Sequence, residues 1–287
     1  MTVHTRGLRP RTPSSSCSLA EELLHGGIAN AGSVTRHGEH VLRPSNPHTA
    51  TIHAFLNALA EVGFDGASKP IGIDPDGRER LVFIAGDVPI PPYASWAQTD
   101  DALASIATLL RRYHDAATIV GVPAAQHDSV WSDEMRDPDA VAGDELVVCH
   151  NDVCLENVVF RDGIAVGLLD FDYAAPGRPL YDLAQFARMC VPVDDPMNSR
   201  MLGWHANDVG GRLRVIADAY GLPPDRSGFL DVLAGGIERG GQFVQRKVEE
   251  GDPNFIKMWN DLGGMERFDR RRRWFSANRE RIAEALG

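Results

Sequence analysis

Hydrophobic residues follow two different patterns along this chain. In the first third, short apolar runs are separated by turn residues, a pattern that predicts β-strands. We expect one hairpin from residues 33–36 and 40–43 and a second from residues 70–73 and 80–85. Between them, one helix is predicted from apolar residues at helical spacing, which are Ile52, Phe55, Leu56, Leu59 and Val62.

The rest of the chain is predicted to be mostly helical. It follows a Pro-rich segment, residues 86–92, that suits neither a helix nor a central strand. Helices are expected near residues 99–114, 180–190, 209–220, 227–247 and 266–286. The order predicts an α+β fold with a small β-rich lobe at residues 19–86 and a larger, mostly helical lobe at residues 87–287. Residues 1–18 are expected to be a disordered tail.

The composition is that of an ordinary globular protein, with 43% hydrophobic residues, 24% charged residues and a formal net charge of −11. This acidic balance argues against nucleic acid or an anionic membrane as the main partner. No apolar run is long enough for a membrane span or a signal peptide, and the four Cys lack CxxC spacing. We therefore expect a cytoplasmic protein, either a monomer or a homodimer.

A polar cluster is predicted where an apolar strand at residues 146–149 gives way to a loop. Five groups that can bind a metal or move a proton are expected to converge there, namely His150, Asp152, Asn157, Asp170 and Asp172. A hairpin at residues 158–169 brings Asn157 near Asp170, because one precedes its first strand and the other follows its second. Three carboxylates so close together repel one another and need a cation or a proton.

The residue types in this cluster indicate a reaction. The amide oxygen of Asn157 and the carboxylate of Asp170 are hard oxygen donors suited to Mg²⁺, which usually shares substrate phosphates. Asp152 is not needed for the metal, so it is free to accept a proton from a hydroxyl. These features predict metal-assisted phosphoryl transfer with Asp152 as the catalytic base. His150 is expected to be a structural support.

The spacing of the cluster resembles that of the aminoglycoside phosphotransferase and choline kinase superfamily. The residues that carry the resemblance are His150, Asn151, Asp152, Asn157, Asp170, Phe171 and Asp172. The resemblance implies a two-lobed, protein-kinase-like fold with Asp152 as catalytic base. It also implies that Asn157 and Asp170 bind Mg²⁺, that Asp172 assists them, and that Asp182 is structural. Asn151 replaces the usual Gly of the family, and Asn also adopts unusual backbone angles.

The resemblance also implies a site for ATP or GTP in the amino-terminal half. Its phosphate loop would contain Gly27, Asn30 and Gly32, although the chain has no clear GxGxxG there. Backbone groups of the hinge, at Ile84 and Gly86, are expected to face the purine.

A cationic side chain is needed to hold the nucleotide phosphates. Kinases use a Lys on the third strand, but no Lys precedes Lys69 in this chain. Arg43 ends a predicted strand and is the natural substitute. The acid that should pair with this cation is missing from residues 49–59, so His53 or an acid from elsewhere is expected to take its place.

Acidic residues in the carboxyl-terminal half suggest what the acceptor is. Eight lie where the resemblance puts the acceptor-binding helices, namely Asp194, Asp195, Asp208, Asp231, Glu238, Glu249, Glu250 and Asp252. They favour a cationic, hydroxylated acceptor such as an aminoglycoside or a basic peptide antibiotic, although they would also suit an ordinary solvated surface. The Arg270–Arg273 run is expected to be such a solvated face, paired with carboxylates.

The leading hypothesis is a small-molecule kinase that moves the γ-phosphate of a nucleoside triphosphate to a hydroxyl of an amine-bearing compound. Two alternatives stay open. A two-metal phosphoesterase would need additional metal-binding His residues, yet most of the ten His lie in the amino-terminal part. A catalytically weak kinase-like binder, such as an immunity protein, would fit the missing helix acid and the irregular Gly loop.

Overall fold

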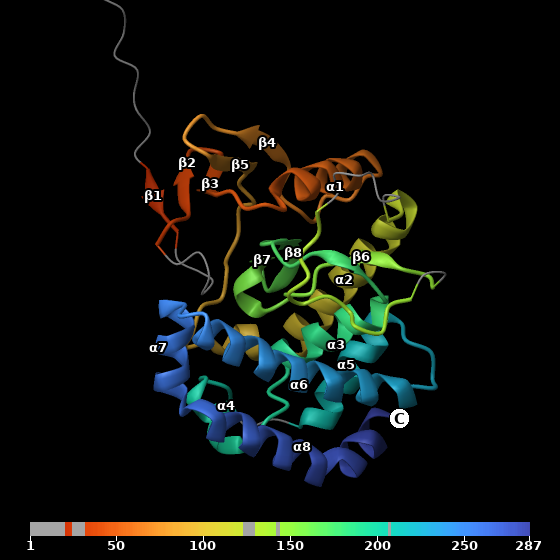
Figure 1. Cartoon of the computed structure of the whole chain (residues 1–287). Helices are drawn as coiled ribbons and strands as arrows, with labels where there is room; N and C mark the ends of the chain where they lie inside the picture. The colour runs from red at the N-terminus through yellow and green to blue at the C-terminus, as the bar shows by residue number, and fades with distance from the viewer. Residues whose placement is uncertain (1–20, 25–31, 123–129, 142–143, 206–207) are drawn as a thin grey trace, which may run out of the picture.

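An antiparallel sheet of five strands forms one end of the molecule (Figure 1). The structure is a computed structural model that describes residues 21–24, 32–122, 130–141, 144–205 and 208–287. The strands occur in the order β1-β2-β3-β5-β4. Their bounds are β1 Glu22–Leu23, β2 Thr35–His37, β3 His40–Pro44, β4 Pro70–Ile73 and β5 Arg78–Val82. Both predicted hairpins are confirmed, and helix α1 (Thr49–Glu61) lies between them in the chain as expected.

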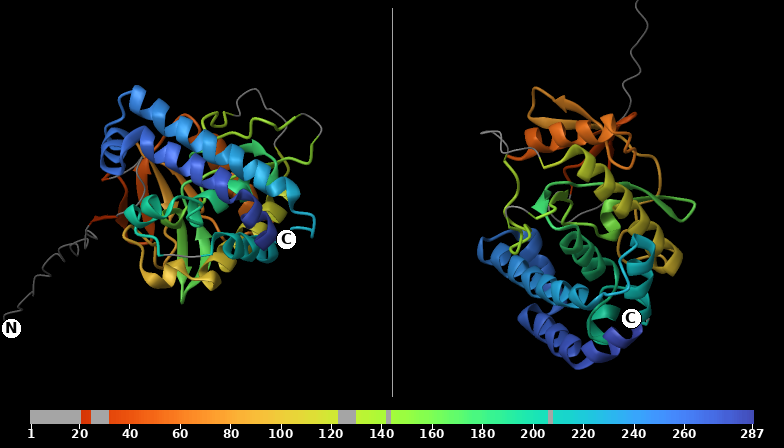
Figure 2. Two further views of the ribbon diagram at one scale, coloured as in Figure 1. Left: turned by 90° about the horizontal axis from the view of Figure 1, so that it is seen from below. Right: turned by 90° about the vertical axis from the view of Figure 1, so that its right-hand side faces the viewer.

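The remainder of the chain is mostly helical and lies below this sheet in Figure 1. Its helices are α2 Asp100–Val120, α3 Pro179–Cys190, α4 Pro196–Met201, α5 Val209–Tyr220, α6 Ser227–Glu249, α7 Pro253–Leu262 and α8 Gly264–Leu286. Its strands form two small antiparallel pairs, β6 (Val147–Cys149) with β9 (Ala175–Gly177), and β7 (Val158–Arg161) with β8 (Ile164–Leu168). The side view in Figure 2 shows the same division. An α+β architecture with two lobes is therefore confirmed, whereas the lobe boundary at residues 86 and 87 stays a prediction.

Two of these helices were not predicted. Helices α4 and α7 are short, and each begins with an Asp followed by Pro, a start signal that the apolar pattern alone did not reveal. Asp195 accepts a hydrogen bond from the backbone N of Met197, and Asp252 accepts one from the backbone N of Asn254. Asp195 and Asp252 are thus helix caps.

The segment that follows the five-stranded sheet, at Gly86 and Asp87, is hydrogen-bonded to the larger part of the molecule. Asp87 and Phe160 exchange two backbone hydrogen bonds of 2.8 Å, which join the chain after the sheet to β7. Gly86 has a φ of 155°, and a Cβ there would lie 2.4 Å from the carbonyl oxygen of Phe160. Only glycine allows this close approach.

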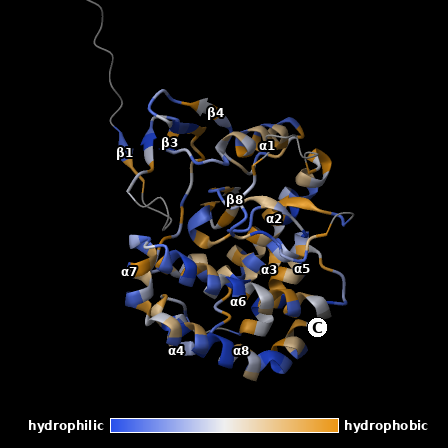
Figure 3. Cartoon of the chain, viewed as in Figure 1, coloured by the Kyte–Doolittle hydropathy of each residue, from blue (hydrophilic) through white to orange (hydrophobic). Residues whose placement is uncertain are grey.

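A continuous apolar core joins α1 and α2 to the strands and helices of the larger part. Hydrophobic positions gather on β8 and α2, whereas α8 is largely hydrophilic (Figure 3). Helix α2 buries Leu103, Ile106 and Leu110 completely or nearly so, and Thr99 caps it as predicted, accepting a bond from Ala102 N. Within the described residues, no helix combines the length and the apolar character needed to cross a membrane.

Candidate active site

The loop that carries the predicted catalytic residues is held by one buried carboxylate. Asp182, in the first turn of α3, accepts hydrogen bonds from the backbone N of His150 at 2.7 Å and of Asn151 at 2.8 Å. Asn151 has a φ of 65°, a left-handed conformation that Asn tolerates better than most residues. Asp182 therefore sets the backbone of the loop immediately before Asp152.

Two histidines support this loop. The Nε2 of His114, on α2, lies 2.9 Å from Asp182, and its Nδ1 lies 2.6 Å from the hydroxyl of Tyr220. His150 is fully buried, with its Nε2 2.9 Å from the carbonyl oxygen of Leu169 and its Nδ1 3.3 Å from the backbone N of Asp152. Both ring nitrogens of His150 are engaged by backbone groups. This geometry suits the support role and leaves neither nitrogen for a metal, which counts against the phosphoesterase alternative.

Asp152 and Asn157 are in direct contact. The Nδ2 of Asn157 donates to Asp152 Oδ2 at 2.8 Å and to the Asp152 carbonyl oxygen at 2.9 Å. Burial raises the pKa of Asp152 well above its ordinary value, and the nearby negative charge of Asp170 raises it further. A carboxylate with a raised pKa is a stronger proton acceptor, as a general base requires.

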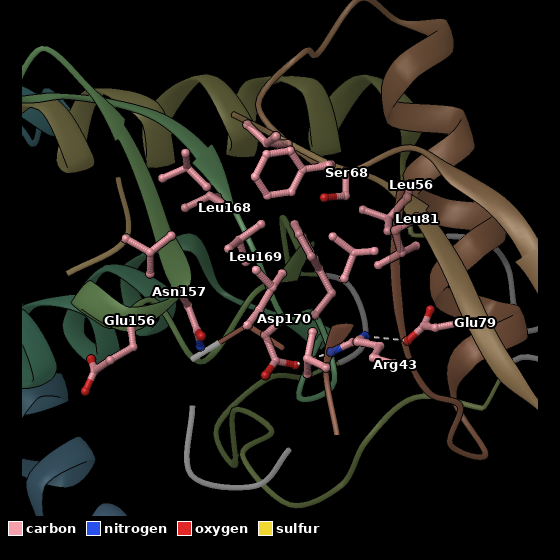
Figure 4. Close-up of a pocket in the computed structure, with 18 of the residues that line it drawn as sticks. Arg43, Leu56, Ser68, Glu79, Leu81, Glu156, Asn157, Leu168, Leu169 and Asp170 are labelled. Atoms are coloured by element: carbon pink, nitrogen blue, oxygen red, sulfur yellow. Dashed lines mark hydrogen bonds and ion pairs between the residues drawn. The ribbon is translucent and has the colours of Figure 1, made fainter. Parts of the chain in front are cut away.

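Arg43 lies beside Asp170, one of the predicted metal ligands (Figure 4). Its Nη1 donates to Asp170 Oδ1 at 2.8 Å and its Nη2 donates to Asp172 Oδ1 at 2.7 Å. Burial and the charge of Asp170 raise the pKa of Asp172 to about 6. One guanidinium thus connects the five-stranded sheet to both carboxylates.

The acid that pairs with Arg43 is Glu79 on β5. Arg43 and Glu79 are direct cross-strand partners, and Arg43 Nε donates to Glu79 Oε1 at 2.6 Å. His53, on α1, lies 2.7 Å from the other oxygen of Glu79. The sequence analysis left open whether His53 or an acid from elsewhere would pair with Arg43. In the structure Glu79 pairs with Arg43, and His53 contacts Glu79. Glu79 was missed because only the β3–β5 register reveals it.

The oxygen donors near Asp170 suit a hard cation. Because the Asn157 amide nitrogen faces Asp152, its oxygen is left without a donor among the described residues. Asp170 and Asp172 each accept a hydrogen bond from Arg43 through Oδ1. This donor set fits Mg²⁺, and Asn157 with Asp170 and Asp172 would hold it.

An apolar cavity of about 280 Å³ lies between the sheet and β7–β8. Its walls come from β3 and β5, from α1 and from the hinge, and include Val41, Leu56, Leu81 and Leu168 (Figure 4). Ile84 and Gly86 line it, as expected of hinge residues facing a purine. Gly32 has a φ of 81°, while Gly27 and Asn30, with most of the expected phosphate loop, lie outside the described residues.

A second cavity of about 850 Å³ lies on the other side of the cluster. Asp152 and Asp172 line this cavity, and Glu156, Asn157 and Asp170 line both cavities. The candidate metal ligands therefore lie where a nucleotide pocket and an acceptor pocket would meet.

The charges around the second cavity differ from the expectation. Of the eight acids proposed to face the acceptor, Asp194 is the one among its lining residues. Three arginines line it instead, which are Arg188, Arg267 and Arg271. Arg271 therefore does not belong to a solvated face, whereas its neighbours Arg272 and Arg273 pair with Glu238 and Glu266 as predicted.

Two sequence matches relate this chain to known proteins. A model of the phosphotransferase enzyme family matches residues 120–216. The trifolitoxin immunity protein of Rhizobium leguminosarum bv. trifolii is 32% identical over 205 residues, covering 70% of this chain and 75% of that protein. The chain belongs to the phosphotransferase enzyme family. The predicted superfamily is confirmed.

Solved structures show the fold of this phosphotransferase family member. A choline/ethanolamine kinase family protein from Mesorhizobium loti has 18% identity and a TM-score of 0.58, with 93% of this chain and 92% of that chain covered. The GDP complex of aminoglycoside 2′-phosphotransferase-IIIa has 14% identity and a TM-score of 0.59, with 91% and 94% covered. These likenesses confirm the two-lobed, protein-kinase-like fold.

Proposed function

We propose that this phosphotransferase moves the γ-phosphate of ATP or GTP to a hydroxyl group of a small molecule. The observation that carries the proposal is the junction of the two cavities at Asn157 and Asp170, with Arg43 on one side and Asp152 on the other. The apolar cavity would take the purine against Ile84 and Gly86. Its phosphates would then extend toward Arg43 and the junction.

Each group has a part in the transfer. Asp152 lines the acceptor cavity and accepts the proton of the attacking hydroxyl as its oxygen forms a bond to the γ-phosphorus. The bond between the γ-phosphorus and the bridging oxygen breaks, and the nucleoside diphosphate leaves with the electron pair. Arg43 holds the phosphates, oriented by Glu79. Mg²⁺, when bound to Asn157, Asp170 and Asp172, neutralises charge on the phosphates.

The hydrogen bond between Asn157 and Asp152 links base and metal site. The amide nitrogen fixes one oxygen of the Asp152 carboxylate, and the amide oxygen is left for the cation. The base is thereby oriented relative to the phosphate that it serves.

Phosphate transfer is tested by replacing the base. Asp152→Asn keeps the shape of the side chain and removes its basicity, so we expect turnover to fall about 10²–10⁴-fold. Asp162→Asn, in the exposed turn between β7 and β8, is the matched control. Nucleotide hydrolysis and transfer are measured against a panel of hydroxylated compounds that includes antibiotics. Equal turnover by wild type and Asp152→Asn would remove Asp152 as the base.

The acceptor is proposed to be a hydroxylated antibiotic-like compound. The name of the related trifolitoxin immunity protein supports a link to a toxic compound. The prediction of a cationic acceptor, such as an aminoglycoside, loses much of its basis because seven of the eight acids lie outside the cavity lining. The remaining support for a cationic acceptor is the group of acidic residues at the junction of the two cavities, and these residues would also bind the metal.

A second candidate is an immunity protein that binds a toxic compound without phosphorylating it. The pairing of Arg43 with Asp170 and Asp172 favours it, because the guanidinium occupies an oxygen of two of the three proposed metal ligands. Calorimetric titration with Mg²⁺ and a non-hydrolysable ATP analogue separates the two. Binding of an antibiotic without Mg²⁺-dependent nucleotide binding would favour the immunity protein over the kinase.

A further inference from the structure

The three arginines of the second cavity lie on one wall. Arg188 lies on α3, and Arg267 and Arg271 lie one turn apart on α8. The two helices are joined there because Arg271 Nη2 donates to the carbonyl oxygen of Arg188 at 3.0 Å and its Nε donates to that of Val193 at 2.9 Å. We call Arg188, Arg267 and Arg271 the arginine wall.

The arginine wall lacks enough negative charge to balance it. Asp194 is the carboxylate beside Arg271, 3.8 Å from its Nε, and it already accepts hydrogen bonds from the backbone N of Asp195 and from Asn198. Neither Arg188 nor Arg267 forms an ion pair with a carboxylate of the described residues. The wall thus holds three cations, and the negative charge near it comes from Asp194 beside Arg271 and from Asp152, whose charge acts on Arg188.

Burial makes this imbalance costly. Burial and the charge of Arg271 lower the pKa of Arg188 to about 10, and the same two effects lower the pKa of Arg267 to about 10. Both side chains stay charged at neutral pH. Half-buried charges of one sign repel each other and are stabilised when an anion binds between them.

The rest of the cavity is apolar. Aromatic and aliphatic side chains line the remainder, among them Trp204, Phe243, Phe255, Met258 and Phe268. The other carboxylates of the lining, Asp152, Glu156, Asp170 and Asp172, belong to the catalytic segment. The cavity therefore has an acidic catalytic end, an apolar body and a cationic wall.

From this arrangement we propose that the acceptor is an apolar molecule that carries an anionic group, such as a carboxylate, which binds the arginine wall. The proposal rests on the proposed function, because it takes the second cavity to be the acceptor site. It names an acceptor class opposite in charge to a polycationic aminoglycoside. A free carboxylate near an apolar side chain, as at the end of a hydrophobic peptide, has the required chemistry.

Arg267 is the member best suited to a test. The charge of Asp152 acts on Arg188, so Arg188 also faces the catalytic base, and Arg271 holds two backbone carbonyls. Arg267 makes no side-chain hydrogen bond or ion pair within the described part of the chain and packs on Phe268 with 5.4 Å from its guanidinium carbon to the ring centroid. Its replacement removes charge while leaving the fold intact.

The experiment compares two fluorescent probes that differ by one anionic group, anilinonaphthalene sulfonate and the uncharged N-phenyl-1-naphthylamine. Titrations are made without nucleotide on wild type, Arg267→Gln, Arg267→Lys and the control Arg272→Gln, which removes an exposed charge of the same helix. We expect Arg267→Gln to weaken sulfonate binding about tenfold, the usual effect of losing one charge-assisted hydrogen bond. Arg267→Lys is expected to retain most of the affinity, and the uncharged probe to bind all four proteins alike.

Two outcomes overturn the proposal. One is equal sulfonate affinity in wild type and Arg267→Gln, and the other is an equal loss in Arg267→Gln and Arg272→Gln. Turnover of paired acceptors, each as a free acid and as its amide, gives a second readout. Faster turnover of the amides would refute the anionic acceptor and leave phosphate transfer standing. Conversely, absence of phosphate transfer with sulfonate binding retained would refute the proposed function and leave the arginine wall as a site for an anionic ligand that is not phosphorylated.

Discussion

Replacing Asp182 with Asn probes the support of the catalytic loop directly. The carboxylate is completely buried and accepts three hydrogen bonds, from the backbone N of His150 and Asn151 and from His114. Asn keeps the shape but has one oxygen where Asp182 has two. In Asp182→Asn, one of the three groups that donate to Asp182 must therefore face the amide NH₂. The other two hydrogen bonds are then made to a neutral oxygen instead of a charged one.

The expected loss follows from these bonds. A hydrogen bond to a charged group contributes about 1.5–3 kcal/mol, and a neutral one about half as much. Losing one charged bond and weakening two predicts about 3–5 kcal/mol less free energy of unfolding, the range found when a buried pair is broken. For a chain of this size, we expect the melting temperature to fall by roughly 6–15 °C.

The pH dependence gives a second signature. Burial raises the pKa of Asp182, but the hydrogen bonds and charges of His114 and His150 together outweigh burial, so the pKa lies below its ordinary value of 3.8. A group with a lowered folded-state pKa stabilises the fold above its unfolded pKa and loses that effect as the pH falls. The stability difference between wild type and Asp182→Asn should stay constant above about pH 5 and shrink below pH 3.8.

The assay is urea unfolding followed by tryptophan fluorescence at a series of pH values. Asp231→Asn is the control, because its carboxylate is exposed and pairs with Arg279 at the surface. That pair should be worth under about 1 kcal/mol. A change of less than 1 kcal/mol for Asp182→Asn, or a difference that grows as the pH falls below 3.8, would refute the role assigned to Asp182.

Two further predictions concern the nucleotide side. Glu79→Gln should raise the KM for nucleotide about tenfold or more, because Arg43 and His53 both lose their charged partner; kinetics at fixed acceptor concentration measure it. Gly86→Ala should lower the free energy of unfolding by about 1–3 kcal/mol, because its Cβ would lie 2.4 Å from the Phe160 carbonyl oxygen; denaturant unfolding measures it.

Each of these two changes has a matched control. Glu61→Gln removes an exposed carboxylate at the end of α1 and should leave the KM for nucleotide unchanged. Gly221→Ala adds a Cβ at a φ of 84° with nothing within 4 Å, so it carries the backbone strain without the clash. Equal stability losses at Gly86 and Gly221 would show that the contact with β7 is unimportant.

The sequence predicted those features that depend on neighbours along the chain. Hairpins and long helices follow from periodicity, and the catalytic loop from the spacing between His150 and Asn157. The pairing of Glu79 with Arg43 was not predicted, because the two residues are 36 positions apart and only the register of β3 and β5 brings them together.

Seven of the eight acids that were predicted to face the acceptor are not among the lining residues of the second cavity, for a similar reason. Arg267 and Arg271 lie four residues apart on α8, and so share one face of the helix, while Arg272 and Arg273 face solvent. A run of four arginines does not reveal which of its members turns inward, because that depends on where α3 and α4 pack. The acids expected there include Asp195 and Asp252, which serve as helix caps.

The two ends of the second cavity are lined by residues from separate parts of the chain. The proposed catalytic groups come from residues 152–172, whereas the arginine wall and apolar body come largely from helices later in the sequence. We expect substitutions in those later helices to change which ligand the cavity binds without displacing the proposed base or metal ligands. Selection can therefore redirect such a chain toward a new compound one side chain at a time while its chemistry is preserved.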